Sequence, residues 1–404
     1  MIIGIDASRA NLKRKTGTEW YSFYLIKNLA RLDKENKYWL YLNEEPSEEL
    51  KAAVVDNLNF SFRVLAWPLY SFWTLGRLSW EMIWHRPDAL FIPAHTMPLI
   101  YPKKTVNTIH DIAFTRESSL YRSAKAKTDK PILRKLIELV VRIVTRGKYH
   151  SESIDYLYWS TEFALNRAKK IITVSHFTKN EIVNVYPQVK KDKIRVVHNG
   201  YNNDSYRKID DNKKISEIKE KYDLEFPYFL YIGRIEKKKN IPVLIEALSI
   251  LREDNPEVKE KMVLIGDASF GYDEVKYIIE EYNLNEDVIM PGWIDEADLP
   301  YILAGASAFI FPSKHEGFGI PLLQAMACGV PVAASDIAVF KEVGGDAFLS
   351  FDHQSKEAIA AAMALLIKDQ KLREKLISRG YERAEKFSWE KCARETLREI
   401  TNFD

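Results

Sequence analysis

Short apolar segments recur along the chain and alternate with longer segments in which apolar residues follow a helical spacing. Residues 2–6 form the first apolar run, and residues 19–32 then place apolar side chains three or four positions apart. Strands that alternate with helices are typical of a parallel sheet covered by helices on both faces. The strands predicted in the first half are residues 2–6, 39–43, 62–66, 89–94, 105–110, 169–175 and 193–200.

A second series of the same kind follows a polar, highly charged segment at residues 202–222, which we interpret as a linker and a helix. Its predicted strands are residues 228–234, 261–267, 288–293, 308–313, 331–336 and 347–351. Two such series predict two doubly wound α/β domains that face a cleft. Ligands bind sheets of this type at the carboxyl ends of the strands.

The length of 404 residues agrees with two domains, and 46% hydrophobic and 29% charged residues are ordinary for a globular protein. Cys328 and Cys392 are the two cysteines, which are too few for a disulfide framework or a cysteine-based zinc site. We therefore expect a reducing compartment. The N-terminus lacks the features of a signal peptide, and no run of 18 uncharged apolar residues predicts a membrane span, so we expect a cytoplasmic protein.

The net charge of +2 conceals two halves of opposite sign. Residues 1–200 contain 32 lysines and arginines against 20 acidic residues, whereas residues 201–404 contain 27 against 37. The halves either meet different partners, attract each other or have simply diverged in charge. Residues 122–148 hold nine basic and two acidic residues. From Pro131 onward they predict a helix that either lies on the inner face of an anionic membrane, faces an anionic acceptor, or packs an apolar stripe on the core.

Aromatic residues are dense at residues 67–84 and 153–165, where they either line an acceptor site or belong to the core. No sequence motif indicates nucleic-acid binding.

The most informative segment is residues 309–336, in which a predicted strand leads into the loop Glu316, Gly317, Phe318, Gly319 and then a helix. Glycines let the backbone approach a ligand closely, and the free amides at a helix N-terminus favour an anion or sugar hydroxyls. Gln324 follows Glu316 by eight residues, about two helical turns, and so lies on a similar face.

Three further loops follow predicted strands. Arg234 and Lys239 come just after the strand at residues 228–234, and two cations of this kind can neutralise a diphosphate and stabilise it as a leaving group. His110 and Asp111 end the strand at residues 105–110, where a lone histidine is either structural or functional. Gly17 lies in the first loop, in which Thr16 and Thr18 are candidate helix caps.

These residues together resemble the Glu-x7-Glu signature of the family 4 retaining glycosyltransferases, which have the GT-B fold, and the resemblance covers nearly the whole chain. It implies that Glu316 lies against the donor sugar. It also implies that Gln324 replaces the second acid, which binds the ribose. Arg234 and Lys239 then bind the donor diphosphate, and His110 contacts the donor sugar.

The resemblance extends to backbone positions. It assigns Gly17, Gly319 and Ile320 to the diphosphate, and Gly317 and Phe318 to the sugar. Trp293 and Ile294 match the segment whose backbone contacts the base. Asp111 either holds its loop or acts on the acceptor hydroxyl.

The predicted domains are residues 1–205 for the acceptor, residues 206–386 for the nucleotide sugar, and residues 387–404 as a helix that crosses back to the first domain. The implied reaction is metal-independent transfer of a hexose, with retention, from a nucleotide sugar to a hydroxyl. GDP-mannose is the first candidate donor and a UDP-hexose the second. The expected acceptor is a lipid-linked or surface glycan. We expect no metal, because Arg234 and Lys239 supply the positive charge, and no cofactor.

Two alternatives remain. A sugar-nucleotide 2-epimerase shares this fold, but it would carry carboxylates for elimination, and the loop EGFGIPLLQ argues against it. A catalytically silent nucleotide-sugar-binding protein is favoured by Gln324 and opposed by His110, Arg234, Lys239 and Glu316.

Overall fold

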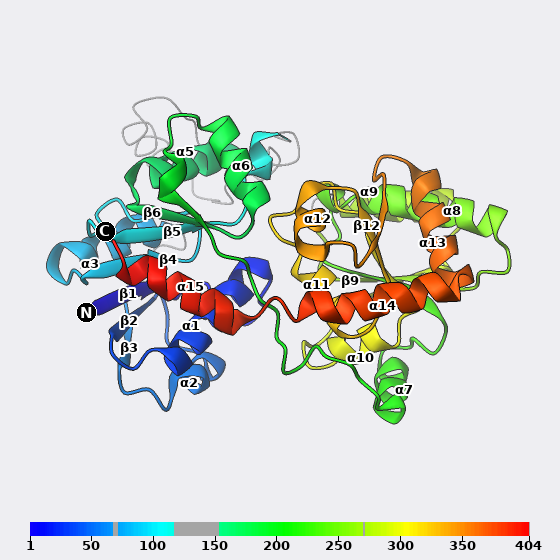
Figure 1. The fold of residues 1–404 in the computed structure, drawn as a ribbon, viewed down its shortest axis with the longest axis horizontal. Helices are drawn as coiled ribbons and strands as arrows, with labels where there is room; N and C mark the ends of the chain where they lie inside the picture. The colour runs from blue at the N-terminus through cyan, green and yellow to red at the C-terminus, as the bar shows by residue number, and fades with distance from the viewer. Residues whose placement is uncertain (68–71, 117–152, 270, 404) are drawn as a thin grey trace. The chain divides into compact units, whose positions relative to one another are not determined.

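The computed structural model describes residues 1–67, 72–116, 153–269 and 271–403 (Figure 1). The basic segment at residues 122–148 lies outside them. The chain forms two compact units. The first contains residues 1–200 together with residues 389–404, and the second contains residues 201–388.

The first unit is built on a parallel sheet with the strand order β3-β2-β1-β4-β5-β6-β7. The strands are β1 (Ile2–Asp6), β2 (Lys37–Leu42), β3 (Phe60–Val64), β4 (Ala89–Ile92), β5 (Thr105–Ile109), β6 (Lys170–Thr173) and β7 (Ile194–Val196). The seven predicted strands are therefore confirmed, with shifted ends. Strands β4 and β5 are buried along their whole length, as expected for the centre of a sheet covered on both faces.

Capping residues fix where the helices of the first unit begin. Its helices include α1 (Gly17–Leu32), α2 (Glu48–Val54), α3 (Ser79–Trp84), α5 (Ser153–Arg167), α6 (His176–Val185) and α15 (Trp389–Thr401). Glu19 accepts hydrogen bonds from the backbone and the side chain of Thr16 at 3.2 and 2.5 Å, so α1 begins with a capping box. Ser175 accepts the amide of Thr178 at 3.0 Å and caps α6. The predicted capping function of Thr16 is thus confirmed, whereas Thr18 lies inside α1.

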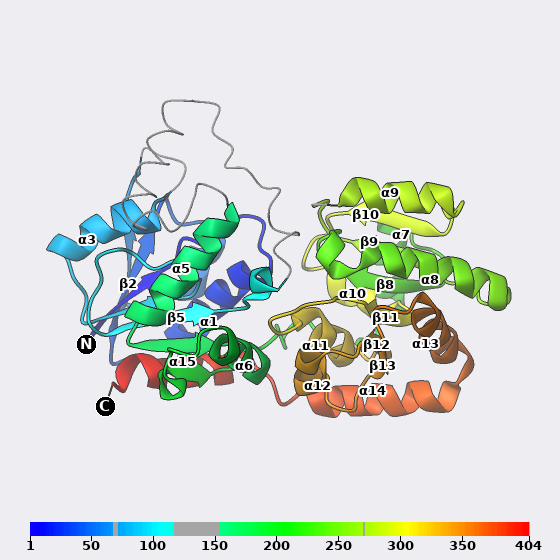
Figure 2. The same ribbon diagram turned by 90° about the horizontal axis from the view of Figure 1, so that it is seen from above.

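The C-terminal helix α15 packs against α1, although the whole second unit separates them in sequence (Figure 2). The ring of Trp389 stacks on Tyr24 with centroids 5.6 Å apart and planes 12° apart, and its edge meets Tyr21 at 6.0 Å. Lys170 of β6 donates to Glu399 at 2.7 Å. The predicted return of this helix to the first domain is confirmed.

The second unit contains a parallel sheet with the strand order β10-β9-β8-β11-β12-β13. The strands are β8 (Tyr228–Ile232), β9 (Lys261–Ile265), β10 (Val288–Gly292), β11 (Ala308–Phe311), β12 (Val332–Ser335) and β13 (Leu349–Phe351). The helices are α7 (Asn212–Lys221), α8 (Ile241–Asp254), α9 (Tyr272–Glu281), α10 (Leu299–Ala304), α11 (Ile320–Ala327), α12 (Ala338–Gly344), α13 (Lys356–Lys368) and α14 (Gln370–Ala384).

The strand order reverses direction at one point in each sheet, between β1 and β4 and between β8 and β11. Loops that leave the carboxyl ends of strands diverge at such a point and leave room for a ligand. The two predicted α/β domains are therefore confirmed, and each has one favoured edge for binding.

Both cysteines are buried free thiols. Within the described ranges, we find no helix with the length and apolar character that crossing a membrane requires.

Candidate functional site

An ion pair joins the loops that leave β8 and β11 of the second unit. Lys239, in the short helical turn Lys237–Lys239, donates to Oε1 of Glu316 at 2.5 Å. Ser313 donates its hydroxyl to the same oxygen at 2.9 Å. The side chains of Lys239 and Glu316 are only 16% and 13% exposed, so water screens this pair weakly. The sequence motifs identified both residues but gave no sign that they touch.

Arg234 follows β8 in the same loop and is exposed, which leaves its guanidinium accessible to an anion. Its backbone carbonyl accepts a hydrogen bond from the buried hydroxyl of Tyr231 at 3.0 Å. Burial, together with the negative charge of Glu316, raises the pKa of Tyr231 well above its usual value, so the hydroxyl keeps its proton and remains a donor. Arg234 thus extends from a backbone that Tyr231 holds in place.

Gly319 ends the loop before α11 and adopts a left-handed conformation with φ of 92°. A Cβ atom at this position would lie 2.8 Å from the ring of Phe340, so the conformation and the packing both require glycine. The turn leaves the amide of Ile320 at the start of α11. Phe318 is buried and its ring meets the edge of Phe387 at 5.8 Å, so a ligand would meet Phe318 through its backbone.

Gln324 and Trp293 are partly exposed, on α11 and after β10 respectively, whereas the neighbouring Ile294 is buried. A buried Ile294 side chain agrees with recognition through the backbone at this position.

In the first unit, His110 follows β5, and its Nε2 donates to the carbonyl of Pro93 at 2.9 Å. The edge of its ring packs against Tyr21, with centroids 4.7 Å apart and planes at 88°. Burial lowers the pKa of His110 to about 4 because it disfavours the imidazolium ion. The ring is therefore neutral at pH 7, with the proton on Nε2, and Nδ1 is a hydrogen-bond acceptor.

Asp111 makes the contacts of a loop-holding residue. Its Oδ1 accepts the amide of Ala113 at 3.1 Å, and its carbonyl accepts Nε2 of His95 at 2.8 Å. Gly17 is exposed at the start of α1, and a Cβ atom added there would have no neighbour within 4 Å.

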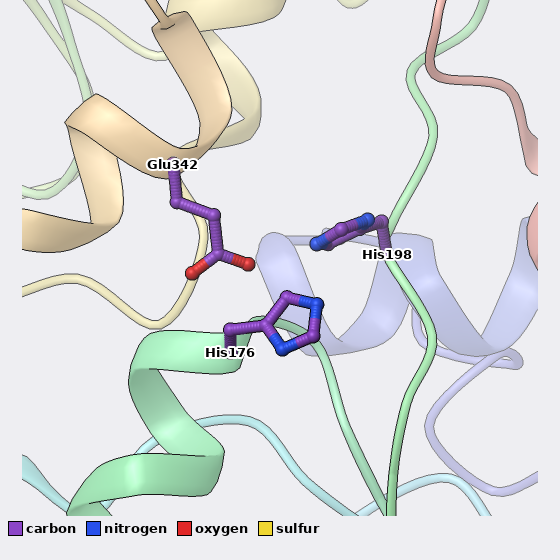
Figure 3. Close-up of side chains that lie close together, drawn as sticks. All are labelled: His176, His198 and Glu342. Carbon is purple, nitrogen blue, oxygen red and sulfur yellow. The ribbon is translucent and has the colours of Figure 1, made fainter.

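The structure also brings together residues that the sequence motifs did not identify. His176, the first residue of α6, and His198, which follows β7, bring their rings to a centroid distance of 5.7 Å (Figure 3). Glu342, drawn in the same figure, belongs to α12 of the second unit.

The sequence motifs also did not identify Ser313 as a partner of Glu316. Its place at the end of a buried strand, just before the glycine-rich loop, could have indicated it.

Both halves of the chain match known protein families. Residues 15–205 match the model described as Glycosyltransferase Family 4, and residues 210–383 match Glycosyl transferases group 1. The O-antigen chain mannosyltransferase B of Escherichia coli is 32% identical over 259 residues, which are 64% of this chain and 67% of that relative. The serotype-specific mannosyltransferase WbdA of Escherichia coli is 27% identical over 229 residues, and this chain covers only 28% of its length.

Solved structures show the same architecture over the whole chain. HepE of Anabaena, solved in complex with UDP and glucose, matches with a TM-score of 0.70 at 17% identity, covering 99% of both chains. WaaG, a glycosyltransferase involved in lipopolysaccharide biosynthesis, matches with a TM-score of 0.71 at 14% identity, covering 100% of both chains. Identities this low establish the fold alone, and the predicted GT-B fold is confirmed. The two family matches and the mannosyltransferase relative show that the chain is a glycosyltransferase and belongs to family 4.

Proposed function

We propose that this enzyme transfers a mannosyl residue from GDP-mannose to a hydroxyl of a glycan, with retention of configuration and without a metal ion. The observation that carries the proposal is the Lys239–Glu316 pair, which lies in the same pair of loops as Arg234. The two mannosyltransferase relatives support the choice of mannose. The UDP-glucose complex of HepE makes a UDP-hexose the competing donor.

In this proposal the donor diphosphate meets Arg234, Lys239 and the amides of Gly319 and Ile320. Arginine offers a planar fork for two phosphate oxygens, and lysine offers a concentrated charge. Negative charge accumulates on the diphosphate as it departs, so fixed cations and helix amides stabilise the transition state more than the bound substrate. These groups supply the positive charge that a metal ion would otherwise provide.

Hydroxyls of the donor sugar would donate hydrogen bonds at two points. Nδ1 of neutral His110 can accept from one sugar hydroxyl, and Oε2 of Glu316 can accept from another. The amide of Gln324 offers one acceptor and two donors to the ribose hydroxyls, and the backbone at Trp293 and Ile294 would meet the base. Gly17 would meet the diphosphate from the first unit.

Retention requires that the acceptor attack from the side that the diphosphate leaves. The acceptor oxygen forms a bond to the anomeric carbon, the bond from that carbon to the phosphate oxygen breaks, and the acceptor proton passes to the departing phosphate. No side chain needs to become a covalent intermediate in this scheme. Asp111 would act by holding the loop that carries His110.

We further propose that the acceptor is a lipid-linked or surface glycan on the cytoplasmic side of the membrane. The O-antigen mannosyltransferase relative supports this choice. Residues 122–148 are the proposed point of contact with anionic lipid, because nine of them are basic.

The decisive experiment is thermal stabilisation of the full chain, in the presence of EDTA, by GDP, UDP, ADP, dTDP and their sugar conjugates. A ligand at about 100 times its Kd stabilises the folded state by about 2.7 kcal/mol. Selective stabilisation by GDP and GDP-mannose, followed by transfer to a mannoside, would support the proposal. Selectivity for UDP would overturn the choice of mannose. Binding without turnover would favour a silent binding protein, and conversion of the donor into its 2-epimer would favour an epimerase.

A further inference from the structure

A second group of polar side chains surrounds the carboxyl end of β1 in the first unit. Asp6 ends this strand and is buried, where its carboxylate accepts the amide and the hydroxyl of Ser8 at 3.1 and 2.6 Å and the hydroxyl of Thr74 at 3.3 Å. These bonds fix the course of the chain just before Arg9. The donor site proposed above does not use this group.

The guanidinium of Arg9 is held by Glu19 at one nitrogen, and the rest of it is accessible to solvent. Its Nη1 donates to Oε1 of Glu19 at 3.2 Å, and the Glu19 side chain is 9% exposed. Because the same Glu19 carboxylate caps α1 through Thr16, the anchor is rigid. The Arg9 side chain itself is 54% exposed, so the rest of the guanidinium is open to solvent. His110 lies close to the same helix, since its ring and that of Tyr21 of α1 have centroids 4.7 Å apart.

Two hydroxyls and an aromatic ring come from α5 and from the loop that follows β4. The hydroxyls of Tyr156 and Thr96 are hydrogen bonded at 3.1 Å, and both residues are partly exposed. The ring of Tyr156 lies 6.4 Å from that of Phe72, two residues before Thr74, which donates to Asp6, so Tyr156 lies beside the group around β1. Trp159 follows Tyr156 by three residues on the same face of α5, is partly exposed, and stacks on Phe163 at 5.4 Å.

The charge balance selects the class of ligand. Arg9 is paired with Glu19 at 3.2 Å and follows Asp6 by three residues, and burial keeps His110 uncharged at pH 7. The group therefore holds no excess of positive charge that would favour a phosphate. A guanidinium fork, two hydroxyls and an aromatic face match instead the vicinal hydroxyls and the apolar face of a neutral sugar ring.

We propose that Arg9, Thr96 and Tyr156 bind the terminal sugar of the acceptor, with Trp159 against its apolar face. The inference rests on the proposed transfer to a glycan, and it makes the acceptor a neutral sugar ring at this point rather than a lipid diphosphate.

The test compares wild-type enzyme with Arg9→Ala, Arg9→Lys and Tyr156→Phe, using p-nitrophenyl α-D-mannopyranoside as neutral acceptor and mannose 1-phosphate as anionic acceptor. Arg31→Ala, an exposed arginine near the other end of α1, is the matched control. We expect Arg9→Ala to raise the KM for the neutral acceptor at least tenfold and to leave the KM for GDP-mannose within twofold. Arg9→Lys should restore little, because lysine lacks the planar fork.

A binding measurement separates this inference from the proposed function. Saturation-transfer NMR detects p-nitrophenyl α-D-mannopyranoside on the protein without any donor. A signal in wild type and in Arg31→Ala that is lost in Arg9→Ala and weakened in Tyr156→Phe would support the acceptor site even if GDP-mannose proved to be the wrong donor. An unchanged signal in all variants, or tighter binding of mannose 1-phosphate that depends on Arg9, would overturn it.

Discussion

Nζ of Lys239 lies 2.5 Å from Oε1 of Glu316, so the cation proposed to bind the donor diphosphate is already paired with the carboxylate proposed to face the donor sugar. The two residues are separated by 77 positions in sequence, and they lie in the loops that follow β8 and β11, which are neighbours in the sheet. A donor that contacts both must share Lys239 with Glu316. Diphosphate binding and sugar positioning would therefore be coupled through a single ion pair.

Glu316→Gln should separate binding from catalysis. Removing the carboxylate frees Lys239 for the diphosphate, so the affinity for GDP should stay constant or increase. The loss of sugar positioning should lower kcat by about 10²- to 10³-fold, the usual effect of removing one positioned polar group. Calorimetry with GDP and single-turnover rates check the two expectations. A parallel loss of affinity and rate would contradict this function of the pair.

Arg234→Ala should weaken donor binding without affecting the fold. A hydrogen bond to a charged group contributes about 1.5–3 kcal/mol, so we expect GDP affinity to fall by about 10- to 100-fold. Because Arg234 is exposed, the free energy of unfolding should change by no more than about 0.5 kcal/mol. Lys375→Ala removes the same charge from an exposed position on α14 and serves as the control. Equal losses in both variants would indicate a general charge effect instead.

Two glycine substitutions should have opposite consequences for stability. Gly319→Ala places a side chain at φ of 92° and 2.8 Å from Phe340, which should cost about 1–2 kcal/mol from the backbone conformation alone. Gly17→Ala adds a methyl group to open space at the start of α1, where alanine should stabilise by about 0.4–1 kcal/mol. Urea denaturation measures both. Similar effects in the two variants would show that the conformation of Gly319 is not required.

His110 should make the protein less stable in acid. The unfolded chain binds a proton on this residue near pH 6.5, whereas the folded pKa is about 4. The folded state is therefore favoured above pH 6.5, and this contribution is lost progressively as the pH falls from 6.5 to 4. His110→Asn keeps an amide that can donate to Pro93 and does not titrate, so its stability should fall less over that interval. Parallel stability curves for the two proteins would contradict the depressed pKa.

Gln324→Glu should reveal whether this position meets the ribose. A carboxylate accepts stronger hydrogen bonds from hydroxyls than an amide does. We therefore expect the KM for GDP-mannose to fall with little change in kcat, and GDP-mannose kinetics measure it. An unchanged KM would remove Gln324 from the donor site.

The sequence was sufficient for the strands and for the separate loops, but not for the contacts between them. The strand predicted at residues 228–234 ends at Ile232, because Gly233 and Arg234 already belong to the loop that leaves the sheet. Gly233 still donates its amide to the carbonyl of Ile265 in β9 at 2.9 Å, although the regular strand has already ended. Strand β5 likewise ends just before His110.

Contacts across long loops had no periodic signal. The pairing of Arg9 with Glu19 depends on the course of residues 10–16, which no spacing rule encodes. The pairing of Lys239 with Glu316 depends on β8 and β11 being neighbours, and a parallel sheet can order its strands in several ways. The motifs therefore identified the chemistry of individual residues, whereas the structure shows which of them form hydrogen bonds and ion pairs with one another.

Because α15 packs against α1, the first unit can complete its packing only after the second unit has been synthesised. The first unit needs Trp389 against Tyr24, and the buried Cys392 against its core, before its packing is complete. A ribosome adds about 5–20 residues per second, so roughly 10–40 seconds pass between the synthesis of residue 200 and that of the end of α15. During that time, while the second unit is synthesised, the aromatic side chains of α1 that contact α15 remain uncovered by that helix. Helix α15, which is made after the whole second unit, therefore completes the packing of the unit that is synthesised first.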